Sequence, residues 1–447
     1  MEKDIVRGRI VDHEGRVLAE SSADGSRSYP YGRILAPVTG YQTERYGATG
    51  VEQVEGQALS GVTADVAHMG PLRTLLRADA GYDVRLTVDA KLSEAAWNAL
   101  GSRHGAVVVM DASTGAVLTM VSAPSFDPAS AERHWDELST RADSPLLNRV
   151  TQGLYPPGST FKIVTGTAAL AEHKVTPQEK IFDSGHHWII PKTNAAGEAL
   201  GWINFQEAMA HSDNVYFYEM GNRLGVDTLE RYARMFGLGA RTGIDLPYEQ
   251  SGNIPSIKSL NNKIYKATIS YGYGAQMTFL QMLNAYTVFN NGGVMISPRI
   301  VENLENNGKI YTVNESETRQ VISKPTADVI KGILIKTVES GTGRKGRVAG
   351  LQIGGKTGTA RIAKGGGYSS AYNSSFFGFV NDADSSYTIG VLVREPKRGS
   401  YYAAQNALPI FKRAVGILIE EGYLKPAADA NATQKVEIKD EAVEIKD

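Results

Sequence analysis

The sequence contains no cysteine, so its 447 residues can form neither a disulfide nor a thiolate metal site. No apolar run approaches the roughly 18–20 residues that a membrane span needs, and Val107 to Met110 is typical of the longest runs. Charges nearly cancel, giving a net charge of −1, so no global basic field favours nucleic acid. No HExxH motif occurs, and we interpret the adjacent His186 and His187 as surface residues rather than metal ligands. We therefore expect neither a metal site nor a nucleic-acid partner.

Composition divides the chain into three regions. With 42 % apolar and 21 % charged residues, the length suits two or three folded domains. The segment from Arg7 to Glu20 carries two short β-rich runs around His13-Glu14-Gly15, which predicts a hairpin. After Pro426 the sequence shifts to Ala, Lys, Glu and Asp, a composition typical of disorder. We predict a short β-rich N-terminal domain over residues 1–82, a main domain over 83–425 and a disordered tail over 426–447.

The main domain shows strand patterns at both of its ends and helical patterns between them. Asp89 is placed to cap a helix, and residues 105–122 carry two apolar runs joined by Ala-Ser-Thr-Gly, which predicts a hairpin. Apolar residues at helical spacing from Phe279 to Phe289 predict a helix with one apolar face. Residues 374–380 and 387–393 have the pattern of paired strands. The order predicts an α+β fold, with an antiparallel sheet closed by distant segments, flanking helices and a helical subdomain inside.

The segment YPPGSTFKIVTGTAALAEHK, from Tyr155 to Lys174, predicts a serine nucleophile. Pro156, Pro157 and Gly158 can deliver the chain to a helix but cannot lie inside one. Ser159 is then expected in the first helical turn, with Lys162 three residues on and on the same face. A serine hydroxyl needs a base, and a lysine whose pKa is lowered by burial or by a second cation can act as one. Since S-x-x-K also occurs by chance, this motif alone does not establish catalysis.

Two further motifs supply partners for such a serine. Ser212-Asp213-Asn214 offers a second hydroxyl that can pass a proton, and an amide that can bind a substrate amide. Taken alone, it is equally an ordinary turn or N-cap before an apolar helix. Lys356-Thr357-Gly358-Thr359 offers a cation and hydroxyls for a carboxylate, and Gly358 lets a ligand approach the backbone. The N–H groups of Ser159 and Thr359 are predicted to form an oxyanion hole.

The same lysine lies in GLQIGGKT, residues 350–357, which matches the phosphate-binding pattern G-x-x-x-x-G-K-[ST]. A phosphate loop needs a helix that begins at the Lys-Thr pair. Here Gly358 follows at once, and Gly365-Gly366-Gly367 comes within ten residues, which disfavours a helix. We therefore predict a strand that runs into a loop, and we interpret the nucleotide pattern as coincidence. The loop over residues 363–370 is either a mobile element beside the site or a plain hairpin tip.

S-x-x-K, S-D-N and K-T-G occur in the order that is the signature of penicillin-binding proteins and serine β-lactamases. The sequence resembles a class B penicillin-binding protein, a peptidoglycan D,D-transpeptidase. The likeness covers about Arg7 to Gly422 and includes RGRIVDHEGRVLA, LLNRVTQGLYPPGSTFK and GGKTGTA. It implies a penicillin-binding-protein/β-lactamase-like transpeptidase domain preceded by a small pedestal domain, with no cofactor.

The resemblance implies a role for each matched residue. Ser159 would attack the carbonyl between the last two D-alanines of a stem peptide, and Lys162 would accept its proton. Ser212 would relay protons, and Asn214 would bind the substrate amide. Lys356 would help to keep Lys162 neutral. The terminal carboxylate would be held by Lys356, Thr357 and Thr359.

The family also implies substrates, partners and a location. Peptidoglycan stem peptides would be cross-linked through a serine acyl-enzyme, and β-lactams would acylate the same serine. The usual partner is a membrane glycan polymerase of the shape, elongation, division and sporulation family. A single N-terminal membrane helix, absent from this sequence, would hold the enzyme on the outer side of the cell membrane. A D,D-carboxypeptidase, a serine β-lactamase and a penicillin sensor share the three motifs and remain alternatives.

Overall fold

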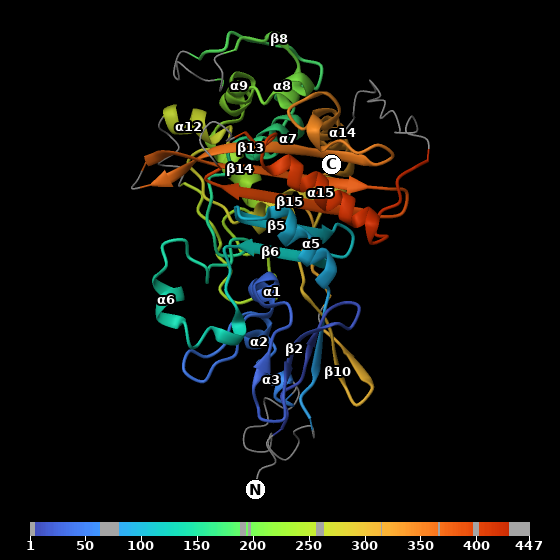
Figure 1. The fold of residues 1–447 in the computed structure, drawn as a ribbon. Coiled ribbons are helices and arrows are strands. Elements are labelled where there is room, and N and C mark those ends of the chain that lie inside the picture. Colours follow the sequence, from blue (N-terminus) through green and yellow to red (C-terminus); the bar gives the residue numbers. More distant parts are fainter. Residues whose placement is uncertain are drawn as a thin grey trace. The chain divides into compact units, whose positions relative to one another are not determined.

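The computed structural model describes residues 5–62, 80–187, 194, 198–255, 263–313, 315–364, 367–396 and 402–428. The chain divides into two compact units, each assembled from separate stretches of sequence. Unit 1 comprises Met1–Gln152, Gly243–Glu249 and Ser297–Glu317. Unit 2 comprises Gly153–Thr242, Gln250–Ile296 and Thr318–Asp447. Figure 1 shows the elements of both units.

A six-stranded sheet of order β11-β10-β4-β1-β2-β3 lies in unit 1. Its strands are β1 (Ile10–Val11), β2 (Val17–Ser21), β3 (Arg27–Ser28), β4 (Asp83–Leu86), β10 (Val301–Asn306) and β11 (Lys309–Thr312). The predicted hairpin is confirmed, because β1 and β2 pair antiparallel, with Ile10 opposite Ala19. Strand β4 then pairs with both β1 and β10. The sheet of unit 1 therefore includes the hairpin β10–β11, which follows β4 by more than 200 residues in the chain.

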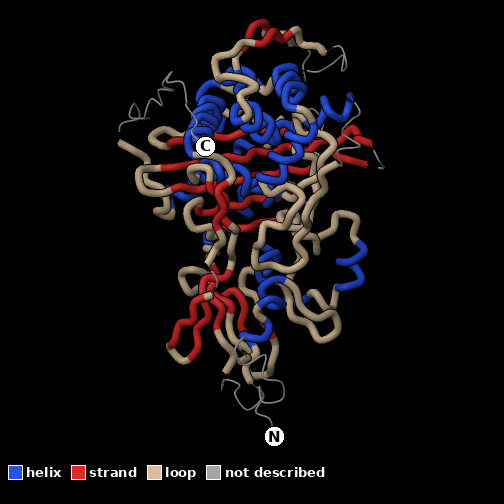
Figure 2. The backbone as a smooth tube through the Cα atoms, turned by 180° about the vertical axis from the view of Figure 1, so that it is seen from behind, coloured by secondary structure: helices blue, strands red, loops and turns tan. Residues whose placement is uncertain are grey.

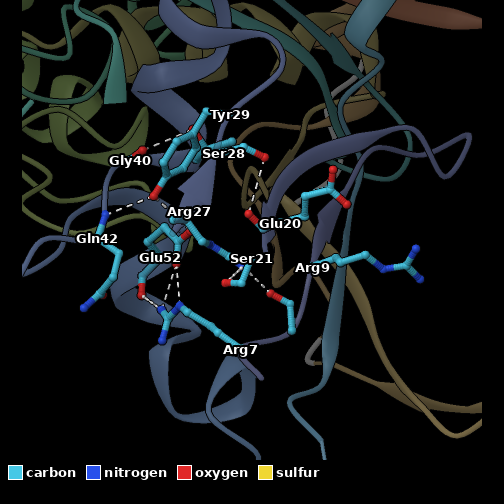
Figure 3. A network of polar contacts seen from close by, with 12 residues as sticks. Arg7, Arg9, Glu20, Ser21, Arg27, Ser28, Tyr29, Gly40, Gln42 and Glu52 are labelled. Atoms are coloured by element: carbon cyan, nitrogen blue, oxygen red, sulfur yellow. Dashed lines mark hydrogen bonds and ion pairs between the residues drawn. The ribbon is translucent and has the colours of Figure 1, made fainter. Parts of the chain in front are cut away.

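Beside this sheet, a buried carboxylate joins the first strands to a short helix (Figure 3). Glu52 lies in α2 (Gly50–Val54) and is 0 % exposed. It accepts hydrogen bonds from Arg7 Nε at 2.8 Å, Arg27 Nε at 2.7 Å and the Tyr29 hydroxyl at 3.2 Å. Two guanidinium groups and a phenol compensate the carboxylate for its lost hydration. The network ties residues 7–29 to the helical segment that follows.

The remaining elements of unit 1 include the second predicted hairpin. Strands β5 (His104–Asp111) and β6 (Val117–Ala123) pair antiparallel, as predicted, and their apolar residues are buried. Asp89 caps α5 (Ala90–Leu100), accepting from the N–H groups of Lys91 and Leu92, which confirms the predicted cap. The other helical segments are α1 (Gly32–Thr39), α3 (Gly56–Leu59), η2 (Pro128–Ser130) and α6 (Trp135–Thr140).

In unit 2, three neighbouring strands pair antiparallel in the order β13 (Gln352–Lys364), β14 (Gly367–Asn381) and β15 (Ser386–Arg394). Helices cover both faces, because successive side chains of a strand point to opposite sides. Phe376 contacts Phe411 of α15 (Ala407–Glu420), whereas Phe377 contacts Phe279 of α13 (Phe279–Asn290). Figure 1 shows α15 crossing one face of these strands, and Figure 2 shows the molecule from behind. The paired strands predicted at 374–380 and 387–393 are confirmed.

Most helices of unit 2 come before strand β13 in the sequence. The other elements of this part are η3 (Gly158–Phe161), α7 (Lys162–Ala171), β7 (Ile181–Asp183), β8 (Gly201–Ile203), α8 (Phe205–His211), α9 (Asn214–Leu224), α10 (Val226–Met235), α12 (Lys263–Ile269), β9 (Val294–Ile296), β12 (Thr318–Gln320), α14 (Lys324–Ser340) and η4 (Arg344–Gly346). The helix predicted from Phe279, Met282, Tyr286 and Phe289 is confirmed as α13, and all twelve of its residues are buried. Two of its polar side chains bond to the sheet strands, with Thr287 donating to Thr388 at 3.0 Å and Asn290 to Asn381 at 2.9 Å.

Several sequence predictions concern the ends of elements. Strands β13 and β14 pair as far as Lys364 opposite Gly367, so residues 363–370 lie at the turn of a hairpin; Gly365 and Gly366 fall outside the described residues. The predicted disordered tail also falls outside them from residue 429 onward. Among the helices described, none is both long and apolar enough to cross a membrane.

Candidate active site

The serine predicted to be the nucleophile lies in a tight turn at the start of a buried helix. Ser159 belongs to η3, a 3₁₀ turn, and the α-helix itself begins at Lys162; the predicted first turn is therefore present in a tighter form. Gly158 has φ 56° and donates its N–H to Gly272 O at 3.0 Å. A Cβ at Gly272 would lie 1.9 Å from Gly158 O, so a glycine is required there. Ser159 remains partly exposed, while Lys162 is 0 % exposed.

The amine of Lys162 is the centre of the site. Its Nζ lies 3.3 Å from Ser159 Oγ and 3.1 Å from Ser212 Oγ. It also donates to the Ser212 carbonyl oxygen and to Asn214 Oδ1, both at 2.7 Å. The S-x-x-K and S-x-N motifs therefore meet at one nitrogen. Within the described part of the chain these partners are hydroxyl, carbonyl and amide oxygens rather than carboxylates, and so leave any charge on Lys162 unpaired.

The S-D-N segment is the turn between α8 and α9. Ser212 ends α8 in the left-handed region, with φ 60° and ψ 39°, a conformation that is uncommon for a residue with a side chain. Asp213 caps α9 by accepting from Tyr216 N at 2.6 Å. The segment is thus the turn and N-cap that its sequence alone allowed. The same geometry directs both Ser212 and Asn214 at Lys162. Their chemical roles stay predictions.

The site contains two fully buried lysines, Lys162 and Lys356. Burial lowers the pKa of Lys162 well below its usual 10.5, and the nearby charge of Lys356 lowers it further, while Asp213 acts in the opposite direction. Burial also lowers the pKa of Lys356 to about 7. Lys356 is 0 % exposed and donates to the Thr357 carbonyl oxygen at 3.2 Å. A neutral amine at Lys162 can accept a proton from Ser159, which an ammonium cannot.

The K-T-G segment is part of a strand, and this excludes a phosphate-binding loop. Residues 352–364 form β13 without interruption, so no helix begins at Lys356. One edge of β13 pairs with β14, and the segment also lies against η3. A Cβ at Gly358 would lie 2.8 Å from Thr160 Cγ2, and a Cβ at Gly158 would lie 3.0 Å from Ala360 Cβ. The strand carrying Lys356, Thr357, Gly358 and Thr359 therefore runs beside the turn that holds Ser159. The oxyanion hole stays a prediction.

Thr342 also contacts this strand and is not part of any motif identified in the sequence. Thr342 follows α14, is exposed, and accepts a hydrogen bond from the Thr357 hydroxyl at 2.8 Å. Its own N–H donates to Ala210 O at 3.0 Å, in the last turn of α8. Thr342 thus links the K-T-G strand to the helix that ends at Ser212. A threonine between Gly341 and Gly343 directly after a helix is a weak signal that could have indicated a functional turn.

The motifs that meet here are those of an acyl-transfer site. The sequence profile of the penicillin binding protein transpeptidase domain matches residues 105–416, and that of the penicillin binding protein A dimerisation domain matches residues 7–79. The chain belongs to the penicillin-binding protein transpeptidase family. The predicted family and its fold class, an α+β transpeptidase domain with a small β-rich N-terminal domain, are therefore confirmed.

Several penicillin-binding proteins are similar to this chain over most of its length. PbpA of Mycolicibacterium smegmatis, named a peptidoglycan D,D-transpeptidase, is 32 % identical over 451 residues, which is 93 % of this chain and 89 % of the relative. Stage V sporulation protein D of Bacillus subtilis is 30 % identical over 446 residues, covering 94 % of this chain and 67 % of the relative. MrdA of Acinetobacter baumannii, also named a peptidoglycan D,D-transpeptidase, is 32 % identical and is covered over 65 % of its length. The chain thus spans about two thirds of the last two relatives.

Solved structures agree with this assignment. The D,D-transpeptidase domain of a peptidoglycan glycosyltransferase from Eggerthella lenta superposes with a TM-score of 0.82 at 29 % identity, covering 94 % of this chain and 100 % of the other. Penicillin-binding protein A from M. tuberculosis, as an imipenem acyl-enzyme complex, superposes with a TM-score of 0.81 at 26 % identity and the same coverage. The second structure is a covalent complex with a β-lactam, the chemistry that the resemblance predicts for this family.

Proposed function

We propose that this penicillin-binding protein is a peptidoglycan D,D-transpeptidase that works through a Ser159 acyl-enzyme. The observation that carries the proposal is the 3.3 Å separation between Ser159 Oγ and the buried amine of Lys162. Burial and the charge of Lys356 lower the pKa of Lys162, and a lysine with a lowered pKa one turn from a partly exposed hydroxyl can act as its general base. The relatives named peptidoglycan D,D-transpeptidases support peptidoglycan as the substrate.

In the acylation step Ser159 Oγ attacks the carbonyl carbon between the two terminal D-alanines, and its proton moves to Lys162 Nζ. The oxyanion that forms accepts hydrogen bonds from the N–H groups of Ser159 and Thr359. Collapse breaks the peptide bond, and the proton passes from Lys162 through the Ser212 hydroxyl to the departing D-alanine amine. Ser212 Oγ lies 3.1 Å from Nζ, which is within reach for this transfer.

In the second step an amine from a neighbouring stem peptide attacks the acyl-enzyme ester. Lys162 accepts the proton of this amine and returns one to Ser159 Oγ as the ester bond breaks, so that the cross-link forms and the free enzyme is restored. Lys356, Thr357 and Thr359 hold the terminal carboxylate of the donor, and Gly358 leaves room for its backbone. Asn214 binds the donor's amide with its side chain.

The alternative enzymes, a carboxypeptidase and a β-lactamase, form the same acyl-enzyme and differ in the molecule that accepts the acyl group. A carboxypeptidase or β-lactamase passes the acyl group to water, and a β-lactamase must hold that water beside a base. Lys162 bonds to hydroxyl, carbonyl and amide oxygens in the described chain, and no carboxylate base is among those partners. This favours a long-lived acyl-enzyme and transfer to an amine. A membrane anchor, an extracytoplasmic location and a membrane glycan polymerase as partner complete the proposal.

The test is covalent labelling with a fluorescent penicillin, followed by intact-mass analysis of the adduct. We expect one adduct per chain, at Ser159, that is released slowly. Ser159→Ala abolishes the label and leaves the thermal melt nearly unchanged, whereas the exposed-site control Ser340→Ala labels like the parent protein. Labelling of Ser159→Ala would refute the nucleophile. Rapid release of hydrolysed antibiotic would favour a β-lactamase, and a donor pentapeptide trimmed but never joined to an added amine would favour a carboxypeptidase.

A further inference from the structure

The turn that carries Ser212 and Asn214 is part of a hydrogen-bonded group of three polar residues, two of which are buried carboxylates. Asp183, the last residue of β7, is 1 % exposed, and Asp213 is 2 % exposed. Asn194 lies between them, and its Nδ2 donates to Asp213 Oδ2 at 2.7 Å and to Asp183 Oδ2 at 3.0 Å. We call these three residues the Asp-Asn-Asp clamp.

The clamp is bonded to the backbone on both sides. The Asn194 side-chain carbonyl accepts the N–H of Asn214 at 2.9 Å, so one amide contacts both the acid and the backbone of the S-D-N segment. Asp183 accepts from the N–H groups of Gly185 at 2.7 Å and Leu200 at 2.8 Å, which fixes its carboxylate at the end of β7. Through these bonds the strand, the residue between β7 and β8 and the catalytic turn form one connected unit.

The clamp is linked through Asn214 to the amine of Lys162. Asn214 donates its backbone N–H to Asn194 Oδ1 at 2.9 Å. Its side-chain oxygen accepts a hydrogen bond from Lys162 Nζ at 2.7 Å. Ser212, two residues earlier, is held in a left-handed conformation while two of its oxygens contact Lys162. A non-glycine residue in that region is strained and persists only where its surroundings enforce the conformation. Bonds that fix the next residues of the turn are such surroundings.

We propose that Asp183 and Asn194 are positioning residues for the reaction, which hold the S-D-N turn so that Ser212 and Asn214 converge on Lys162. The inference rests on the proposed function, since it concerns the same acylation step. Neither residue touches the nucleophile, and both act through Asp213 and Asn214. Their loss lowers the rate of acylation without removing any group that reacts.

Charge in the clamp bears on the same amine. The ionisable groups that face Asp213 are Asp183 from β7 and Lys162 from α7, and Lys356 from β13 faces Lys162 in turn. Burial, together with the neighbouring Asp183, raises the pKa of Asp213 to about 6, because two adjacent buried carboxylates resist double ionisation. An ionised Asp213 raises the pKa of Lys162, which disfavours its neutral form. The clamp therefore influences both the geometry and the charge state of the base.

The test compares acylation by a fluorescent penicillin in the parent protein and in three variants. Asn194→Ala removes the amide, Asn194→Asp replaces its donor by a carboxylate, and Phe182→Leu is the matched control, an exposed neighbour of Asp183 on β7. We expect Asn194→Ala to lower the second-order acylation constant at least tenfold at pH 7.5. Asn194→Asp should be similarly slow at that pH and should recover relative to the parent between pH 7 and 5, as its carboxyl gains a proton to donate. Phe182→Leu should acylate like the parent.

Two results would overturn the inference while leaving the proposed function intact. One is parent-like acylation of folded Asn194→Ala, with the parent protein still labelled at Ser159. The other is a ratio of Asn194→Asp to parent that stays constant between pH 7 and 5. If Asn194→Ala fails to fold, the second result alone decides, since Asn194→Asp has nearly the same shape. Absence of any label on the parent protein would instead refute the function.

Discussion

Replacing Lys356 by methionine should make the protein more stable at neutral pH while abolishing acylation. The folded protein buries this lysine completely and lowers its pKa from 10.5 to about 7. Each pKa unit corresponds to about 1.4 kcal/mol, so burial of the charged amine costs about 5 kcal/mol well below pH 7 and about 4 kcal/mol at pH 7, where half of the folded molecules have lost the proton. Methionine has a similar length and no charge, and the change forfeits one hydrogen bond, worth about 1 kcal/mol.

The pH dependence separates this cost from the packing of the new side chain. Between about pH 7 and 10.5 the unfolded chain binds a proton at Lys356 that the folded chain does not. The free energy of unfolding of the parent therefore rises with pH across this window, and below it the full cost is present. From pH 7 to 9 the rise due to Lys356 is about 2 kcal/mol, and Lys356→Met should lack it. Packing of the methionine contributes equally at both pH values and cancels.

Urea unfolding at pH 7 and pH 9 measures the effect. Lys324→Met is the control, because the Lys324 side chain is 71 % exposed and should show no difference in pH dependence from the parent. A parent and a Lys356→Met variant that change in parallel between the two pH values would show that Lys356 is solvated in the folded state. That result would also contradict the lowered pKa of Lys162, because burial is its main cause as well.

Three further outcomes are expected. As pH rises through about 7, Lys356 loses its charge, so the noncovalent affinity for a carboxylate-bearing β-lactam should fall more than the acylation rate, which stopped-flow kinetics separates. Thr342→Val removes the hydroxyl that accepts from Thr357, and should weaken that affinity roughly threefold, whereas Thr342→Ser should retain it; equal affinities would contradict the role. Gly166→Ala would place a Cβ 2.6 Å from Phe205 Cζ, so a loss of about 1–3 kcal/mol of stability is expected in thermal or urea unfolding, and an unchanged melt would show that Phe205 can move.

Local elements of the structure were predictable because neighbouring residues determine them. Asp89 caps a helix by accepting from N–H groups only two and three residues on, and the strand hairpins follow from apolar runs separated by short turns. Helix α13 was predictable in the same way, but the burial of its polar side chains was not. The partners of Thr287 and Asn290 are Thr388 and Asn381, which lie about 90 to 100 residues away and cannot be inferred from spacing.

The residues of the proposed catalytic pair show the same division. Ser159 and Lys162 are three residues apart at a helix start, so their proximity is a local consequence of the sequence. Ser212 joins them across 50 residues, and its place was predicted from motif order and family resemblance rather than from physics. Asp183, Asn194 and Thr342 carried no usable pattern, because each acts through hydrogen bonds to segments that only folding brings near.

The sequence by itself determined which reacting groups are present, which of them share a helical turn, and where most strands and helices form. Tertiary structure alone decided that two lysines lose contact with water, that a left-handed serine aims two oxygens at one of them, and that a distant strand edge lies beside the nucleophile. The physical reason is that a pKa depends on desolvation and on charges close in space, and both are set by packing between segments far apart along the chain.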